Sequence, residues 1–302
     1  MRPSALLALC LALVVTLAPA LAGASTDDRP RIVVTFSILA DLASQVAGDD
    51  ARVTSLTPVG AEVHEWELTA RNFAALEDAD IVFYNGYNLE QWMGQVRATV
   101  SDGTPIIPVA ERSGRDTLPI VTGDMEGDPD PHLWMDPRAA AAYARVMADA
   151  MADIAPDHAD AFSERAAAVE SELEALHEEL AEILASIPSE QRTLVTSEAA
   201  FLYFADAFDF EHMGIWGTNS EEEGTPRQIA AVTDYIVERQ PAALFWESTI
   251  SDRHVRSVSG DTGVPYHGPL YVDSLSAADG DAGDYKRMMR HNARMLVDKL
   301  AP

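Results

Sequence analysis

The longest helical pattern of the chain lies at its middle, and its length limits the folds open to the rest. At about 1.5 Å per residue, a helix from Asp157 to Ile187 would span about 45 Å, which is more than one small domain. Its apolar stripe has spacings of three and four and comprises Val169, Leu173, Leu176, Leu180, Ile183 and Ile187. A coiled-coil segment is one alternative. Because strand-like runs flank this helix on both sides, we favour a helix that lies across two lobes.

Short β-branched runs alternate with helical patterns on both sides of this helix. Such alternation indicates a parallel sheet covered on both faces. We expect strands at 31–36, 53–57, 81–86, 105–109, 192–197, 211–217 and 242–246, and one that ends at 274. The predicted fold class is therefore α/β, with two lobes, each a mainly parallel sheet flanked by helices, joined by a single long helix. We place the N-terminal lobe at 25–155, the linking helix at 156–188 and the C-terminal lobe at 189–302.

Residues 1–24 have the pattern of an export signal. Arg2 supplies the positive start, an apolar core follows, and small residues near Ala24 offer cleavage sites. The apolar run is shorter than the roughly 20 residues that a membrane-spanning helix needs, so we expect removal and no membrane insertion. Cys10 is the only cysteine and lies inside this core, so disulfides and thiolate metal sites are excluded after cleavage. We predict a periplasmic protein.

The formal net charge of −28 argues against nucleic acid as a partner, because binding to phosphates requires a basic face. It argues equally against an anionic lipid surface. Most of this charge is expected to be a solvated acidic surface that keeps an exported protein soluble.

Four metal-capable side chains follow predicted strands or lie on strand-exit loops. His64 and His132 belong to the first lobe, and Glu198 and Asp273 to the second. Ligands in doubly wound sheets bind beyond the carboxyl ends of the strands, so the four are candidates for one divalent-cation site. Helix capping is the structural alternative for the two carboxylates. Glu247 follows another strand and is a fifth candidate.

The histidine of the sequence Asp130-Pro-His132-Leu-Trp-Met-Asp136-Pro is held between two Asp-Pro pairs. Proline restricts both its own φ and the residue before it, which makes the loop stiff. Asp130 or Asp136 could accept the second ring N–H of His132, as carboxylates beside metal-bound histidines often do. His267, near Asp273 in sequence, is a further candidate for contact with the ligands.

Five motifs together resemble the cluster A-I (cluster 9) solute-binding proteins of metal ABC importers, over essentially the whole chain after the signal. The motifs are Pro58-Val-Gly-Ala-Glu-Val-His64-Glu-Trp-Glu67, Asp130–Pro137, Thr196-Ser-Glu198-Ala-Ala-Phe-Leu-Tyr-Phe204, Gly224-Thr-Pro-Arg-Gln-Ile229 and Leu270-Tyr-Val-Asp273-Ser-Leu275. The resemblance implies a receptor without enzymatic activity, most simply a monomer, that holds metal between two lobes and passes it to a membrane permease. By position, the implied ligands are His64, His132, Glu198 and Asp273.

The third ligand position carries information about the metal. Zinc-type members of this family usually have histidine there and a His-rich loop before the second ligand, whereas this chain has Glu198 and no histidine in 111–129. The resemblance therefore implies the manganese or iron branch, and oxygen-rich donor sets favour ions harder than Zn²⁺. We expect Mn²⁺, with Fe²⁺ possible and Zn²⁺ competing for the same site. A departure from the family pattern at Val63, where proline is usual, removes no ligand.

Two alternatives remain at this point. One is a zinc-specific receptor of the same family. The other is a metal-dependent hydrolase with Glu247 or Glu198 as base, although the chain has no His-Glu-x-x-His pattern and no nucleophile elbow. If His64 and His132 keep ordinary imidazole pKa values, metal binding should weaken below about pH 6.

Overall fold

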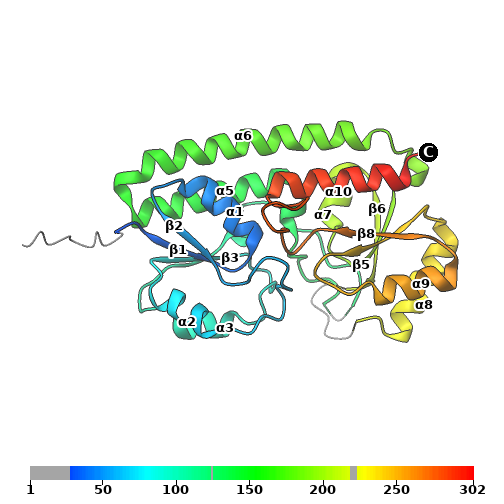
Figure 1. Ribbon diagram of the computed structural model, residues 1–302, viewed down its shortest axis with the longest axis horizontal. Helices are drawn as coiled ribbons and strands as arrows, with labels where there is room; N and C mark the ends of the chain where they lie inside the picture. Colours follow the sequence, from blue (N-terminus) through cyan, green and yellow to red (C-terminus); the bar gives the residue numbers. More distant parts are fainter. Residues whose placement is uncertain (1–27, 124, 218–222) are drawn as a thin grey trace, which may run out of the picture.

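Parallel strands pair in both halves of the chain, in a computed structural model that describes residues 28–123, 125–217 and 223–302 (Figure 1). The expected signal, residues 1–24, lies outside the described residues. The first sheet has the strand order β2-β1-β3-β4, with every pairing parallel. Its strands are β1 (Arg31–Val34), β2 (Arg52–Ser55), β3 (Ile81–Tyr84) and β4 (Ile106–Pro108).

The first sheet is apolar on both faces, which explains why its central strands read as continuous hydrophobic runs. In β1, Ile32 and Val34 join one core while Val33 joins the core on the opposite face, as the two-residue period of a strand requires. Helices cover both faces (Figure 1). They are α1 (Ser37–Ala47) and α5 (Pro137–Ile154) on one side and α2 (Ala70–Glu77) and α3 (Met93–Thr99) on the other.

The second half contains two parallel strand pairs, β5-β6 and β7-β8, with β5 lying beside β7. The strands are β5 (Thr193–Glu198), β6 (Glu211–Trp216), β7 (Leu244–Glu247) and β8 (Tyr266–Leu270). The helices around them are α7 (Leu202–Phe208), α8 (Pro226–Arg239), α9 (Arg253–Thr262) and α10 (Tyr285–Leu300). The last strand ends at Leu270 rather than at 274, because the backbone N–H and carbonyl of Tyr271 bond to the Asn292 side chain of α10 instead of to a neighbouring strand.

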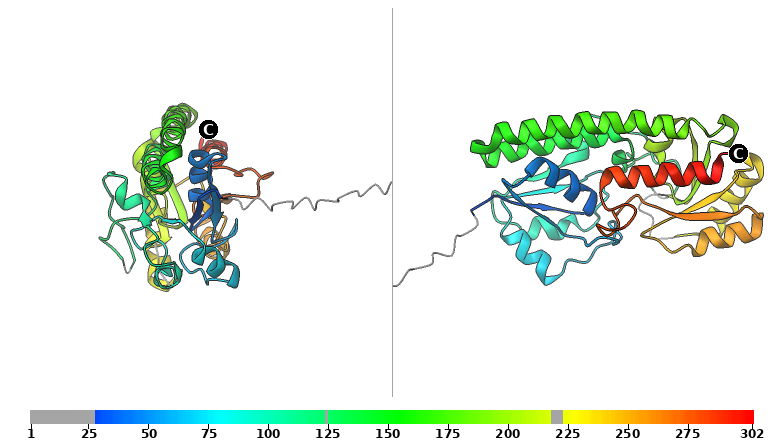
Figure 2. Two further views of the ribbon diagram at one scale, coloured as in Figure 1. Left: turned by 90° about the vertical axis from the view of Figure 1, so that its left-hand side faces the viewer. Right: turned by 45° about the horizontal axis from the view of Figure 1, so that its top comes forward.

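The long helix predicted at the middle of the chain is α6 (Ala159–Leu184). Its 26 residues span about 39 Å and run above both sheets, beside α5 over the first and α10 over the second (Figures 1 and 2). Two of its glutamates form ion pairs with α10, Glu172 with Lys286 and Glu179 with Arg290. These two carboxylates of α6 therefore bind cations of α10 and do not belong only to a solvated acidic surface.

Regular backbone pairing occurs in the histidine-free stretch before His132, at residues 111–123 and 125–129. This stretch begins within α4 (Val109–Arg112), and Pro119 pairs with Pro129 in an isolated antiparallel bridge. The loop then enters a 3-10 turn, Leu133–Met135, which places His132 at the start of the chain's return to α5. No helix of the described residues is both long and apolar enough to cross a bilayer.

Candidate metal centre

The four candidate ligands meet between the two halves. His64 comes from the loop between β2 and α2, and His132 from the turn before α5. Glu198 is the last residue of β5, and Asp273 lies in the loop after β8. All four side chains are buried, with at most 6% of any of these residues exposed. The two nitrogen donors thus belong to the first half and the two carboxylates to the second.

The distances between donor atoms are those of a shell around one small cation. Nε2 of His64 lies 3.4 Å from Oε1 of Glu198 and 3.8 Å from Oδ2 of Asp273. Nε2 of His132 lies 3.6 Å from Oδ1 of Asp273. The edge of a tetrahedron with bonds of about 2.1 Å is roughly 3.4 Å, so a metal ion fits with small inward movements.

The donor atoms have no other use within the described part of the chain. Nε2 of both histidines, Oε1 of Glu198 and both carboxylate oxygens of Asp273 are buried and have no hydrogen-bond partner there. Buried polar atoms are normally satisfied, because leaving one unpaired costs free energy. Donor atoms of His64, His132 and Asp273 all lie within 4.8 Å of one another, and Oε1 of Glu198 lies beside His64, so these unsatisfied atoms mark a place for a cation.

Each imidazole is oriented by a bond to its other nitrogen. Nδ1 of His132 lies 3.2 Å from Oδ1 of Asp130, and Nδ1 of His64 lies 3.1 Å from the carbonyl oxygen of Leu89. A carbonyl or carboxylate oxygen can only accept, so in the neutral ring Nδ1 carries the hydrogen and Nε2 offers its lone pair to the site. Asp130 accordingly holds the position expected for it beside His132.

The electrostatics of the metal-free site favour protons on these nitrogens. Burial disfavours the charged imidazolium, but the negative charges of Glu198, Glu62 and Asp273 outweigh it and raise the pKa of His64 to about 10. For His132, burial is likewise outweighed by the carboxylates of Asp130 and Asp273, and the pKa rises well above its ordinary value. Proton competition therefore extends to higher pH than the limit near pH 6 expected from the sequence.

Glu62 was missed by the sequence analysis, although it lies only two residues before His64. Its carboxylate accepts the backbone N–H of His64 at 2.9 Å and lies 3.8 Å from Nε2 of that ring. About a third of its side chain is exposed (35%), unlike the four buried candidates. Burial raises its pKa to about 7, against the lowering effect of His64. Glu62 thus adds a carboxylate at the solvent side of the site.

Glu247 and His212 hold the backbone of Glu198. The two carboxylate oxygens of Glu247 accept the N–H groups of Ser197 and Glu198 at 3.1 and 3.2 Å, and burial raises the pKa of Glu247 to about 8. On β6, Nε2 of His212 lies 2.8 Å from the hydroxyl of Thr196, which donates to the Glu198 carbonyl at 2.5 Å. Glu247, the fifth candidate from the sequence, therefore binds backbone N–H groups beside the site, and nothing in the sequence singled out His212.

Two other candidates lie elsewhere. Asp136 caps α5 through the backbone N–H of Arg138 and pairs with that guanidinium, so it does not orient His132. His267 lies on β8 and faces Phe245 of β7. The pKa of His267 is lowered by burial and by Lys299 at the end of α10. The structure therefore gives neither residue a bond to the four donors within the described residues.

Trp134 connects the halves next to the site. Its ring lies against His132, with centroids 5.1 Å apart, and its indole N–H donates to the Val272 carbonyl at 2.9 Å. The Tyr285 hydroxyl donates to the Trp134 carbonyl at 2.5 Å. The ring thus closes one wall of the site, and its bonds fix the loop that carries the aspartate donor.

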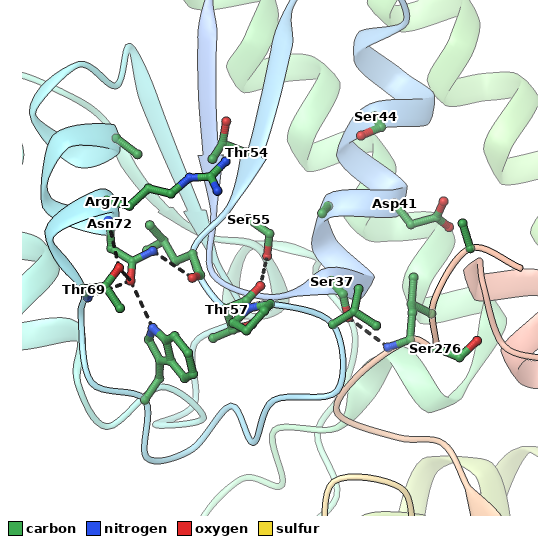
Figure 3. A pocket seen from close by; sticks show the side chains of 18 of the residues that line it. Ser37, Asp41, Ser44, Thr54, Ser55, Thr57, Thr69, Arg71, Asn72 and Ser276 are labelled. Carbon is green, nitrogen blue, oxygen red and sulfur yellow. Dashed lines mark hydrogen bonds between the residues drawn. The ribbon is translucent and has the colours of Figure 1, made fainter. Parts of the chain in front are cut away.

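A separate cavity of about 660 Å³ opens beside the site, between α1, the start of α2 and the segment 275–283 (Figure 3). None of the four donors lines it. At its inner wall the Ser37 hydroxyl accepts the Leu275 N–H at 2.9 Å and lies 3.2 Å from the Ser274 hydroxyl. The Gly60 N–H donates to that second hydroxyl at 2.6 Å. These bonds tie the loop that carries the aspartate donor to the loop that carries the first histidine.

Comparison with known proteins gives the chain a family. The family described as zinc-uptake complex component A, periplasmic, matches residues 32–299. The iron-binding protein YfeA of Yersinia pestis is 38% identical over 276 residues, which are 91% of this chain and 86% of that protein. The manganese-binding lipoprotein MntA of Halalkalibacterium halodurans is 37% identical over 281 residues, 92% of this chain and 91% of the relative.

Solved structures agree with the fold. The Mn-bound periplasmic metal binding protein of Candidatus Liberibacter asiaticus has a TM-score of 0.82 at 27% identity, covering 90% of this chain and 100% of that one. The periplasmic zinc binding protein TroA of Treponema pallidum has a TM-score of 0.83 at 28% identity, covering 91% and 100%. These matches confirm the predicted two-lobed α/β class and the absence of an enzymatic role. The chain belongs to the zinc-uptake component A family, the cluster A-I metal-binding receptors of ABC importers.

Proposed function

We propose that this protein captures Mn²⁺, with Fe²⁺ as a second cargo, through His64, His132, Glu198 and Asp273 and delivers it to the permease of an ABC importer. The observation that supports this most is the set of five buried donor atoms, contributed by both halves, that have no hydrogen-bond partner among the described residues, with those of His64, His132 and Asp273 grouped within 4.8 Å. No bond is made or broken in the cargo. Binding and release are the whole activity.

The oxygen content of the site supports Mn²⁺ or Fe²⁺ over Zn²⁺. Two nitrogens and up to four carboxylate oxygens can give a coordination number above four, which Mn²⁺ and Fe²⁺ accept and tetrahedral zinc does not need. Both oxygens of Asp273 face the histidines, one toward each ring. The relatives that are named for iron and manganese also favour Mn²⁺ or Fe²⁺ as the cargo.

A zinc receptor is the second candidate, because the family and one structural neighbour are named for zinc. Affinity for nearly any nitrogen and oxygen site is higher for Zn²⁺ than for Mn²⁺, so Zn²⁺ should compete whichever ion is the natural cargo. Selectivity between the two cargoes then depends on geometry and on the ions available in the compartment.

The working arrangement that we propose is a periplasmic monomer released from a cleaved signal at residues 1–24. It has an N-terminal lobe at 25–155, the linking helix at 156–188 and a C-terminal lobe at 189–302. Its partner is the membrane permease, and it neither inserts into the membrane nor binds nucleic acid. Because α6 packs along both halves, we expect only small lobe movements on metal binding, which small-angle scattering can measure.

Calorimetric titration of metal-free protein with Mn²⁺, anaerobic Fe²⁺ and Zn²⁺ tests this function. We expect all three ions to bind at one site, and Asp273→Asn to abolish binding of each. Glu198→His should strengthen Zn²⁺ relative to Mn²⁺, because it replaces a carboxylate with a third imidazole. Tight Zn²⁺ binding without any response to micromolar Mn²⁺ or Fe²⁺ would leave the zinc receptor as the answer.

A further inference from the structure

A buried glutamate with no part in the donor set lies behind the two histidines. Glu90, between β3 and α3, is 3% exposed. Its carboxylate accepts the Thr35 hydroxyl at 2.7 Å, the Asn85 N–H at 2.8 Å and the Gly86 N–H at 3.3 Å. Burial raises its pKa. An acid taken out of water needs such donors, and these three come from the carboxyl ends of β1 and β3.

One chain of bonds leads from Glu90 to His132. The Asn85 backbone is held by Glu90, and its side-chain amide donates to the Pro131 carbonyl at 2.8 Å. The oxygen of that amide accepts the Tyr143 hydroxyl at 3.0 Å, which fixes the orientation of the group. The Pro131 carbonyl belongs to the peptide bond that enters His132. The amide therefore sets the position of this histidine's backbone.

A second chain of bonds leads to His64. Nδ1 of His64 is bonded to the Leu89 carbonyl, and this carbonyl belongs to the peptide bond that joins Leu89 to Glu90. The Glu90 side chain turns back to the end of β3 and so anchors that peptide. Both nitrogen donors are therefore connected to the same buried carboxylate, although His64 and His132 come from different loops.

The turn that brings Glu90 into place has strained backbone. Gly86, Tyr87 and Asn88 have φ values of 98°, 49° and 59°, so three successive residues have positive φ and two of them are not glycine. Such conformations persist where the surroundings over-determine them, and they cluster at functional sites. Glu90 closes this turn by accepting the Gly86 N–H. The strained turn and the buried carboxylate of Glu90 are therefore linked directly by a hydrogen bond.

We propose that Glu90 is a positioning residue of the metal centre, which holds His64 and His132 with their Nε2 atoms aimed at the cargo before it arrives. This inference rests on the proposed function. It adds an explanation of how the two histidine nitrogens are held in position before the metal binds. Glu90 touches no metal. Its effect passes through Asn85 to one ring and through the peptide bond after Leu89 to the other.

The test compares Glu90→Gln with wild type and with Glu111→Gln. Glu111 is the matched control, since it is exposed and accepts the Tyr87 N–H of the same turn from outside at 3.0 Å. Affinity is measured for Mn²⁺ directly and for Zn²⁺ by competition with a chromophoric chelator, and metal-free melting is recorded separately. We expect Glu90→Gln to weaken both ions about 10- to 100-fold, as loss of a partner behind a ligand typically does, with Glu111→Gln near wild type.

A purely structural role is distinguished by combining Glu90→Gln with ligand variants. The fold loss of Zn²⁺ affinity caused by Glu90→Gln should be at least about twofold smaller in the His64→Gln and His132→Gln backgrounds, because the effects of coupled residues are not additive. In the Glu198→Gln background the fold loss should be unchanged. Thr35→Val, which removes one bond to Glu90, should give a smaller penalty with the same pattern, and it serves if Glu90→Gln does not fold.

Equal penalties in all three backgrounds, or unchanged affinity in folded Glu90→Gln, would overturn the inference while leaving the receptor function intact. Wild-type protein that bound neither Mn²⁺ nor Zn²⁺ would instead overturn the receptor function itself, and the inference with it.

Discussion

The metal-free site holds protons that an incoming ion must displace, and this makes capture strongly pH-dependent. At pH 7, His64 with a pKa of about 10 is protonated, and removing that proton costs about 4 kcal/mol, or roughly a thousandfold in affinity. His132 shifts in the same direction. A protonated imidazole cannot donate its lone pair, so affinity rises with pH until each raised pKa is passed.

We therefore expect close to two protons to be released per Mn²⁺ at pH 7. Calorimetry in phosphate and in Tris, which differ in ionisation enthalpy, counts them. The apparent Kd should fall by up to about 100-fold per pH unit between pH 6.5 and 8, tenfold for each proton. His132→Gln, if it still binds, should release one proton fewer. Release near zero with flat affinity over this range would show that the imidazoles are neutral, and the electrostatic reasoning would fail.

The same shift acts with a definite sign on the stability of the metal-free protein. A raised histidine pKa contributes stability that is fully present below the unfolded value of 6.5 and is lost as pH rises through about 10. The melting temperature of the metal-free protein should therefore fall as the pH rises from 6.5 to about 10, whereas that of the metal-loaded protein should not fall with it. Parallel melting curves for the two forms would contradict this account.

The remaining predictions concern single side chains. Asp130→Asn should weaken Mn²⁺ binding about tenfold, because the ring of His132 loses its anionic partner; titration calorimetry measures this. Trp134→Phe removes the donor to the Val272 carbonyl and should lower the free energy of unfolding by about 1–3 kcal/mol in urea melts, mainly through the carbonyl left unpaired. Leu176→Ala, at a buried position of α6, should cost about 2–5 kcal/mol by the same measurement while the metal affinity of the folded fraction stays unchanged.

Much of the fold was predictable because periodicity is local. The apolar stripe predicted the long helix at the middle of the chain, which the structure confirms as α6, Ala159–Leu184. The end of β8 was misplaced because Tyr271 and Val272 continue an apolar run, although the backbone of Tyr271 bonds to the Asn292 side chain and not to a strand.

The four donors could be proposed because ligands bind beyond the carboxyl ends of parallel strands, and because their motifs resemble those of a known family. The residues that hold those donors could not, since their partners come from distant parts of the chain. Glu90 looks like an ordinary helix glutamate in sequence, and only the structure shows it bonded to Thr35. His212 gave no signal other than its place in a strand, yet it bonds to Thr196 beneath a donor. The sequence hint for Glu90 is its place shortly after Asn85-Gly86, where β3 ends.

The division of donor atoms between the halves has a consequence for how such proteins diversify. Among the four donor residues, both carboxylates come from the C-terminal half and both imidazoles come from the N-terminal half. After gene duplication, one copy can change its preferred ion by substitutions confined to the second half, while the first half is inherited unaltered as a common nitrogen template. Exchanging residues 189–302 between relatives of different metal preference should transfer that preference as a unit.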